Sequence, residues 1–186
     1  MDKPRFIIGI DPDVEKSGVA ILNMESKKFV CVEAVPFTEL ISKFQSWFGL
    51  TKGDTQGFLV VMENSDSRTN WHLGNIAYDK RLSLEGKLRK SAAIGHGAGL
   101  CHATQRHIQE LAESLEFEVV LQFPLKKGWI GPDGKITQDE IMQFIPDLPK
   151  KMNQECRDAC LLAWNQAGFP IRIPASFYIE RKKKKI

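Results

Sequence analysis

Ile7-Ile8-Gly9-Ile10-Asp11 is the stretch that decides the fold. A short apolar run of this kind predicts a fully buried strand, and Pro12 ends it because proline cannot extend a central strand. A second run, Phe58-Leu59-Val60-Val61-Met62, also ends in a carboxylate, Glu63. If these two strands are parallel neighbours, both carboxylates emerge at one edge of the sheet.

The remaining elements are predicted from periodicity. Ser17–Asn23 and Phe29–Ala34 have strand character, so with the first strand they form a three-stranded meander. Apolar residues at helical spacing predict an amphipathic helix over 37–48. Further along we expect a helix from Ser91 to about Leu115, a strand over Phe117–Phe123, a short helix over Thr137–Ile145 and a final helix over Asn153–Gln166. This order, βββαβαβα, is that of an α/β fold with a mixed sheet.

Two stretches carry basic residues without a clear period. Residues 64–90 are long and polar, and long loops inside compact domains are often functional. Residues 126–134 form a second loop, rich in glycine and cations. The candidates for nucleic-acid contact in and beside these stretches are Arg68, Trp71, His72, Lys80, Arg81, Lys87, Arg89, Lys90, Lys126, Lys127 and Lys135. Trp71 is interpreted equally as a base-stacking residue or as a loop anchor, and the same alternatives hold for Trp129, with core packing favoured.

Composition limits the class of protein. The 186 residues, 42% hydrophobic and 26% charged, predict one globular domain over 1–174 and a basic C-terminal tail over 175–186. A net charge of +3 favours a polyanionic partner without requiring one. The tail residues 181–185 either follow phosphates or remain solvated. We expect no signal peptide and no membrane span, because no stretch approaches about 20 apolar residues.

The four cysteines, Cys31, Cys101, Cys156 and Cys160, have neither CxxC nor zinc-ligand spacing. Buried free thiols in a reducing compartment are the favoured interpretation.

A further pair of carboxylates completes a candidate site. Glu155 and Asp158 lie three residues apart, on one face of the final helix, and we expect Leu161, Leu162 and Trp164 opposite them as core contacts. Clustered carboxylates repel one another unless a cation neutralises them. Mg²⁺ prefers oxygen ligands and keeps waters, and two such ions about 3.5–4 Å apart serve phosphodiester hydrolysis. The alternative is four unrelated surface acids.

Taken in order, these motifs resemble those of the RuvC-type Holliday junction resolvases. The resemblance covers roughly residues 5–167. It rests on Gly9–Pro12 with Ser17-Gly18, Val60–Glu63, Ser91–Gly99, Leu125–Lys127 with Gly131 and the helix from Thr137, and Glu155–Ala159. It implies an RNase H-like fold, with a mixed five-stranded sheet of a three-strand antiparallel meander plus parallel strands, flanked by helices.

The resemblance also implies a function. It is that of a homodimeric crossover junction endodeoxyribonuclease, which resolves four-way DNA junctions by paired hydrolysis with Mg²⁺ or Mn²⁺, two ions per site. By position, Asp11 bridges both ions, Glu63 holds one, and Glu155 with Asp158 holds the other. Lys126 or Lys127 lies near the scissile phosphate, and Lys126 is the catalytic candidate. Such a protein is expected in the cytoplasm of a bacterium, nucleoid-associated and encoded by host or phage, with other recombination proteins as further candidate partners.

The chain departs from the family pattern at four places. Glu155 stands where the family usually has Asp or His, and Asp13 replaces a glycine of the first motif. Gln138 lies near the position of a lysine that often opens the short helix, and Lys135 is the nearest cation. The 64–90 segment is longer than usual.

Other functions are also considered. One is a less selective RNase H-fold nuclease that acts on flaps, branched DNA or RNA–DNA hybrids, and another is a catalytically inactive junction-binding protein. The retained carboxylates count against the latter, since DNA binding needs no negative charge in the groove. The spacing of Asp11 and Gly18 is also similar to the phosphate loop of actin-like sugar kinases, which need two such domains where this chain has room for one.

Overall fold

The computed structural model describes residues 4–50, 57–65, 76, 78–123, 125 and 128–178. One five-stranded sheet, ordered β3-β2-β1-β4-β5, forms its centre. The strands are β1 (Phe6–Asp11), β2 (Ser17–Asn23), β3 (Lys28–Val35), β4 (Phe58–Glu63) and β5 (Glu118–Gln122). β1, β2 and β3 pair antiparallel, whereas β4 pairs parallel with β1 and with β5. The predicted mixed sheet with its meander is confirmed.

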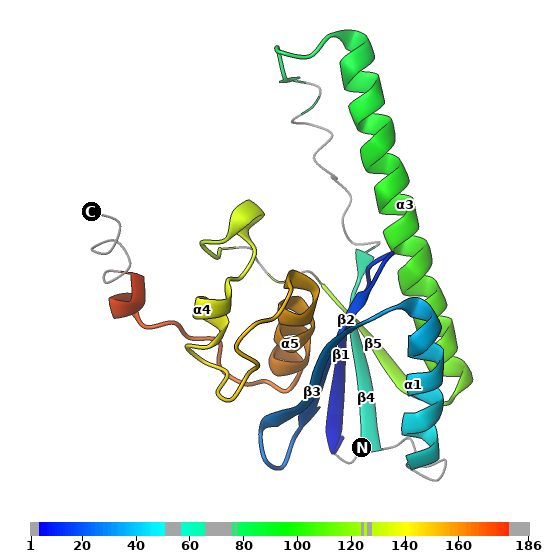
Figure 1. The fold of residues 1–186 in the computed structure, drawn as a ribbon, viewed down its shortest axis with the longest axis vertical. Coiled ribbons are helices and arrows are strands. Elements are labelled where there is room, and N and C mark those ends of the chain that lie inside the picture. Colours follow the sequence, from blue (N-terminus) through cyan, green and yellow to red (C-terminus); the bar gives the residue numbers. More distant parts are fainter. Residues whose placement is uncertain are drawn as a thin grey trace.

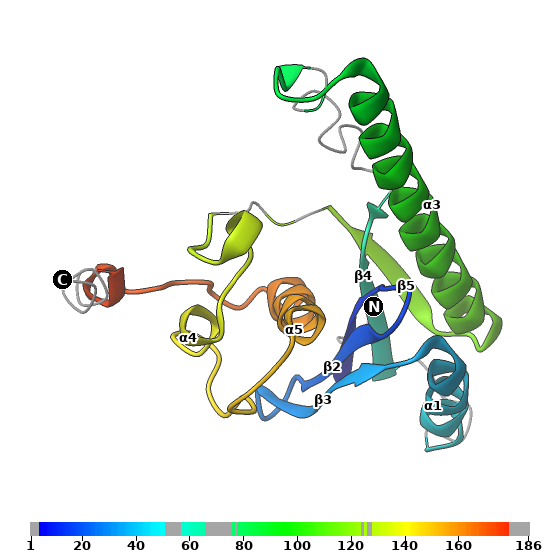
Figure 2. The ribbon, with the colours of Figure 1, turned by 45° about the horizontal axis from the view of Figure 1, so that its top comes forward.

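Helices cover both faces of the sheet (Figures 1 and 2). On one side lie α1 (Phe37–Leu50) and α3 (Leu84–Ser114), and on the other α5 (Gln154–Gln166), with α4 (Gln138–Ile141) and the short helix η3 (Pro132–Gly134) beyond it. None of the described helices is both long and apolar enough to cross a bilayer.

The alternation of strand side chains decides which face each functional residue occupies. Ile8 and Ile10 of β1 pack with the α1 and α3 core, whereas Ile7 packs with the α5 core. Side chains two residues apart share a face, so Asp11 lies on the α5 side. In β4, Leu59 and Val61 pack with the α5 core, so Glu63, two residues further on, lies on the same face by the same rule. Both carboxylates therefore point toward the same helix.

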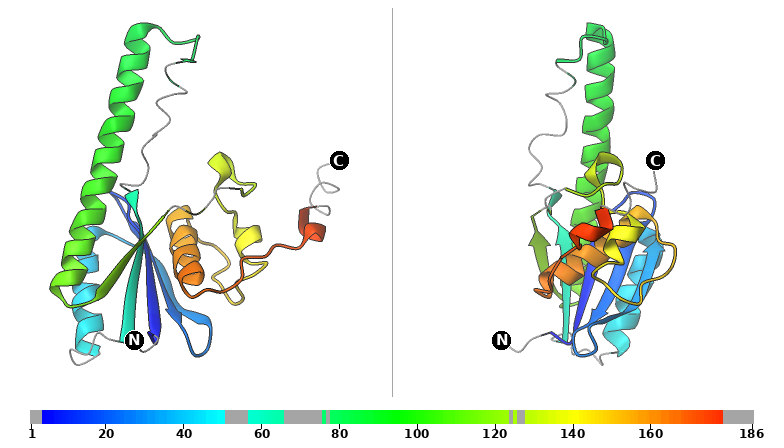
Figure 3. Two further views of the ribbon diagram at one scale, coloured as in Figure 1. Left: turned by 180° about the vertical axis from the view of Figure 1, so that it is seen from behind. Right: turned by 90° about the vertical axis from the view of Figure 1, so that its left-hand side faces the viewer.

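Helix α3 corrects one sequence prediction. It begins at Leu84, where Ser83 caps it by accepting a hydrogen bond from the Gly86 N–H (3.1 Å), and not at Ser91. Its buried residues are Gln105, Ile108 and Ala112, so its first five turns lack the apolar period by which a helix is recognised. The N-terminal part of α3 projects past the sheet (Figure 3). Lys87, Arg89 and Lys90 thus lie on a helix and not in a loop.

The C-terminal elements differ from expectation in extent. Helix α4 ends at Ile141, earlier than the predicted Ile145, although both isoleucines are buried. The tail residues 181–185 lie outside the described residues, and the boundary at 174 stays a prediction.

Candidate active site

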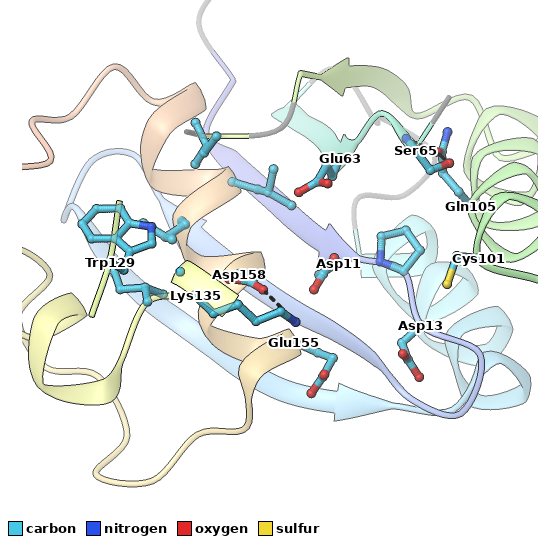
Figure 4. A pocket seen from close by; sticks show the side chains of 16 residues that line it. Asp11, Asp13, Glu63, Ser65, Cys101, Gln105, Trp129, Lys135, Glu155 and Asp158 are labelled. Carbon is cyan, nitrogen blue, oxygen red and sulfur yellow. Dashed lines mark hydrogen bonds and ion pairs between the residues drawn. The ribbon is translucent and has the colours of Figure 1, made fainter. Parts of the chain in front are cut away.

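All four predicted carboxylates line one cavity of about 190 Å³ (Figure 4). Asp11 stands at the end of β1, Glu63 at the end of β4, and Glu155 and Asp158 on the first turns of α5. Met62 pairs with Ile10 in the parallel register, so the two strands end at the same sheet edge. The fold therefore brings together acids from three elements that are distant in the sequence.

Two glycines seat α5 directly on the sheet. A Cβ at Gly9 would lie 2.1 Å from the carbonyl oxygen of Ala159, and one at Gly18 would lie 2.0 Å from that of Glu155. Gly18 is also the register partner of Asp11. Any side chain here would push the helix backbone away, and with it the acids of α5. Gly9 and Gly18 therefore bring Glu155 and Asp158 close to Asp11.

Hydrogen bonds hold the beginning of α5. The Asn153 side chain caps the helix by accepting from the Cys156 N–H (2.9 Å). Arg157, between the two acids, donates to the carbonyls of Ile136 (3.0 Å) and Met152. Arg157 thus binds the segment that precedes α5. The predicted core contacts Leu161, Leu162 and Trp164 are buried. The prediction that they lie opposite the acids is wrong for both leucines, which line the same cavity as Glu155 and Asp158, because residues three and four apart share a helix face.

One predicted cation reaches the cavity among the described residues. The Lys135 Nζ lies 3.9 Å from Asp158 Oδ2 (Figure 4). Asp158 Oδ1 also accepts a hydrogen bond from Gln154 Nε2 (2.9 Å). Gln138, near the position where the family often has a lysine, donates from Nε2 to the Pro149 carbonyl (2.9 Å). Lys135 therefore supplies a positive charge to this site.

The other predicted contact residues divide into two groups. Lys80 and Arg81 lie in the turn before α3, and Lys87, Arg89 and Lys90 on its first turns, away from the cavity. Hydrogen bonds from Arg81 (Nε to Oδ1, 2.9 Å) lower the pKa of Asp79 to about 2, and Arg89 pairs with Glu85 at 2.6 Å. The second group, whose positions lie outside the described residues, comprises Arg68, Trp71, His72, Lys126 and Lys127.

Asp13 and Trp129 have structural partners as well as a place on the cavity wall. Asp13 Oδ1 accepts from the backbone N–H of Glu15 (2.9 Å) and so shapes the turn between β1 and β2. The Trp129 ring stacks on Phe144, with centroids 6.3 Å apart and planes at 20°. Packing is therefore the structural role of Trp129, as predicted.

Sequence reasoning missed Gln105. It is 2% exposed, lines the cavity, and accepts hydrogen bonds from the Ser65 N–H (2.8 Å) and from the Ser65 hydroxyl. The sequence feature that could have identified Gln105 is its spacing: it shares one helix face with the apolar residues Ile108 and Ala112.

The donor set of the cavity suits a hard divalent cation, because all four candidates are carboxylates. Across the described ranges, however, no three Asp, Glu, His or Cys side chains stand close enough together to hold a metal ion. The acids thus line an open cavity and do not form a closed cage. The ligand roles of these residues stay predictions.

Comparison with solved structures identifies the fold. A structure of T. thermophilus RuvC in complex with a Holliday junction substrate is similar over 87% of this chain and 92% of that chain, with 11% identity and a TM-score of 0.53. A second Thermus thermophilus RuvC structure covers 88% of this chain and 97% of its own, with 12% identity and a TM-score of 0.47. No family model and no curated protein matches the sequence. The chain thus has the RNase H-like fold of RuvC, as its motifs predicted, and identity this low establishes the fold alone.

Proposed function

We propose that this protein, with its RuvC-type fold, is a metal-dependent endodeoxyribonuclease that cuts four-way DNA junctions. The observation that carries the proposal is the convergence of Asp11, Glu63, Glu155 and Asp158 on one cavity. Four carboxylates in a groove oppose the binding of a phosphate backbone unless cations lie between them. A protein that only binds junctions would have no use for this arrangement.

The four carboxylates would hold Mg²⁺ or Mn²⁺, with Asp11 shared between two ions. Figure 4 shows Asp11, Glu63 and Asp158 around one cavity, which suits this role. Bound ions of this kind activate a water and stabilise the leaving oxygen of a phosphodiester. By the resemblance to the RuvC-type resolvases, we expect cleavage products with 5′-phosphate and 3′-hydroxyl ends.

The residues of the chain itself orient the reacting groups. The sheet and α5 hold the carboxylates on rigid backbone. Lys135 can exchange Asp158 for a phosphate oxygen of the substrate, because an ammonium 3.9 Å from a carboxylate is a weak, movable partner. Leu161 and Leu162 add apolar side chains to the wall of the cavity, beside the acids.

The substrate partner would be branched DNA. Lys80, Arg81, Lys87, Arg89 and Lys90 would contact phosphates of the junction arms, together with Arg68, Trp71, His72, Lys126 and Lys127. A homodimer would present two cavities to a junction of two-fold symmetry and so cut it in pairs. We place such an enzyme in the cytoplasm, at the nucleoid.

One assay tests the proposal. Labelled four-way junction, linear duplex and RNA–DNA hybrid are each incubated in Mg²⁺ with the wild type, with Asp11→Asn and with the control Glu118→Gln. Glu118 is an exposed acid at the start of β5, and Gln122, the register partner of Glu63, is at the end of that strand. We expect paired nicks in the junction alone, no cutting by Asp11→Asn with binding retained, and wild-type cutting by the control.

Each other outcome identifies a competing function. Comparable cutting of duplex or hybrid would indicate the less selective nuclease. Binding by the wild type without cutting in Mg²⁺ or Mn²⁺ would indicate a junction-binding protein. Unchanged cutting by Asp11→Asn would remove Asp11 from the site.

A further inference from the structure

We infer that Gln105 is a positioning residue for Glu63, through which helix α3 is joined to the carboxylates of the cavity. The inference rests on the proposed function. Its starting point is a buried polar side chain, 2% exposed, on the cavity wall. Its Oε1 accepts both hydrogen-bond donors of Ser65, the backbone N–H at 2.8 Å and the hydroxyl.

This contact lies at the point where the chain leaves the sheet. Glu63 is paired with Gln122 of β5, and the N–H of Asn64 still donates to the Gln122 carbonyl (2.7 Å). At the next residue, Ser65, the backbone turns its N–H to Gln105 of α3. The backbone that carries Glu63 is therefore held by the sheet on one side and by α3 two residues later.

Helix α3 is a firm support at this position. Ile108 and Ala112, one and two turns further along the same face, are fully buried against the sheet. Gln105 is the first buried residue of α3 along the chain. A shift of α3 can therefore reach Glu63 through the Gln105 side chain and Ser65.

The chemistry of an amide suits this role. Its carbonyl oxygen accepts two hydrogen bonds without adding charge beside four carboxylates. A glutamate would accept the same two bonds but would add a further negative charge to the cavity. A methionine of similar shape would accept neither. The two substitutions separate the hydrogen bonds from the packing.

The test measures Mn²⁺ affinity by electron paramagnetic resonance, which requires no turnover. Partners that orient metal ligands typically change affinity by about 10- to 100-fold when they are removed. We expect Gln105→Met to weaken Mn²⁺ binding by about this factor, with binding of the junction in EDTA unchanged. Gln105→Glu should bind Mn²⁺ at least as tightly as the wild type. The matched control is Gln109→Met, one turn further on, where the partly exposed side chain donates from Nε2 to Glu113 (2.8 Å).

The inference is overturned if Gln105→Met binds Mn²⁺ like the wild type, or if Gln105→Glu binds as weakly as Gln105→Met. Should Gln105→Met fail to fold, Ser65→Ala removes the hydroxyl donor alone. We expect that variant to lose about twofold to tenfold in affinity, as for one hydrogen bond, and no loss would also overturn the inference. A wild type whose Mn²⁺ affinity is the same as that of Asp11→Asn would overturn the proposed function itself.

Discussion

At the scale of single residues, two glycines set the distance between α5 and the sheet. Gly9 and Gly18 meet the backbone of α5, which cannot rotate away as a flexible side chain would. The two glycines thus determine the position of Glu155 and Asp158, which are distant from them in the sequence. This explains why a glycine and a carboxylate stand opposite each other in the β1–β2 register.

Replacing Gly18 with alanine should therefore displace α5. The added Cβ would lie 2.0 Å from the Glu155 carbonyl oxygen, so the free energy of unfolding should fall by about 1–3 kcal/mol. Junction cutting should fall further than the loss of folded protein explains. Urea denaturation and cleavage assays measure the two effects.

Gly97→Ala is the matched control. A Cβ there meets nothing within 4 Å, so a helical alanine should raise the free energy of unfolding by about 0.5–1 kcal/mol. Equal stability of the two variants would contradict the role assigned to Gly18.

The buried thiols of Cys156 and Cys160 and the half-buried thiol of Cys31 predict a loss of stability at alkaline pH. Burial, followed by the charge of Glu155, raises the pKa of Cys156 from 9.0 to about 11, and burial with the Glu33 hydrogen bond raises that of Cys31 to about 12. The pKa of Cys160 is raised as well, mainly by burial. The folded chain thus holds protons that the unfolded chain releases, so this stability is complete below pH 9 and falls toward pH 11–12. Urea midpoints across this range should decline, and less steeply in Cys156→Ala; a midpoint that rises with pH would exclude this cause.

At the scale of elements, one carboxylate holds helix α4 and its neighbours together. Glu140 is fully buried and accepts from the N–H of Thr137 (3.0 Å) and of Ile130 (3.0 Å) and from the hydroxyl of Tyr178 (3.3 Å). It therefore joins α4, the loop that leads to Lys135, and the C-terminal segment.

Glu140→Ala should lower the free energy of unfolding by at least about 2 kcal/mol, since it leaves several donors without an acceptor. Tyr178→Phe removes one bond of the same cluster and should cost about 1 kcal/mol or less. Chemical denaturation of both variants measures the difference. If Glu140→Ala were as stable as Tyr178→Phe, the carboxylate would not hold these segments.

At the scale of the whole molecule, the N-terminal part of α3 extends the structure past the sheet edge that bears the cavity (Figures 1 and 3). Lys87 and Lys90 lie three residues apart on this part and so share a face. A helix that carries cations beyond a cavity of carboxylates can guide a phosphate backbone toward it.

Reversing both charges, with Lys87→Glu and Lys90→Glu, should weaken junction binding. The slope of log affinity against log salt should decrease by about one for each DNA phosphate that the variant no longer neutralises. Fluorescence anisotropy over a salt series measures this slope. In the control pair, Lys27→Glu with Lys28→Glu, Lys27 lies in the turn between β2 and β3 and Lys28 begins β3, at the end of the sheet away from the cavity. Equal effects of the two pairs would refute a guiding role for α3.

Much of this architecture could be predicted from the sequence, because strand runs and helical spacing are local signals. β1, β2 and β4 and the positions of the four acids on them and on α5 were predictable for that reason. The start of α3 was not, since a helix that buries no side chain over its first turns has no apolar period to recognise.

The sequence by itself determined the order of the elements and which acids stand at strand ends, since both follow from the residues next in the chain. Only the tertiary structure decided that Lys135 and Gln105 reach the cavity and that Lys87 and Lys90 do not. The physical reason is that the approach of α5 and α3 to the sheet depends on contacts between distant segments, such as Gly18 with Glu155 and Ser65 with Gln105. No local pattern of residues records these contacts.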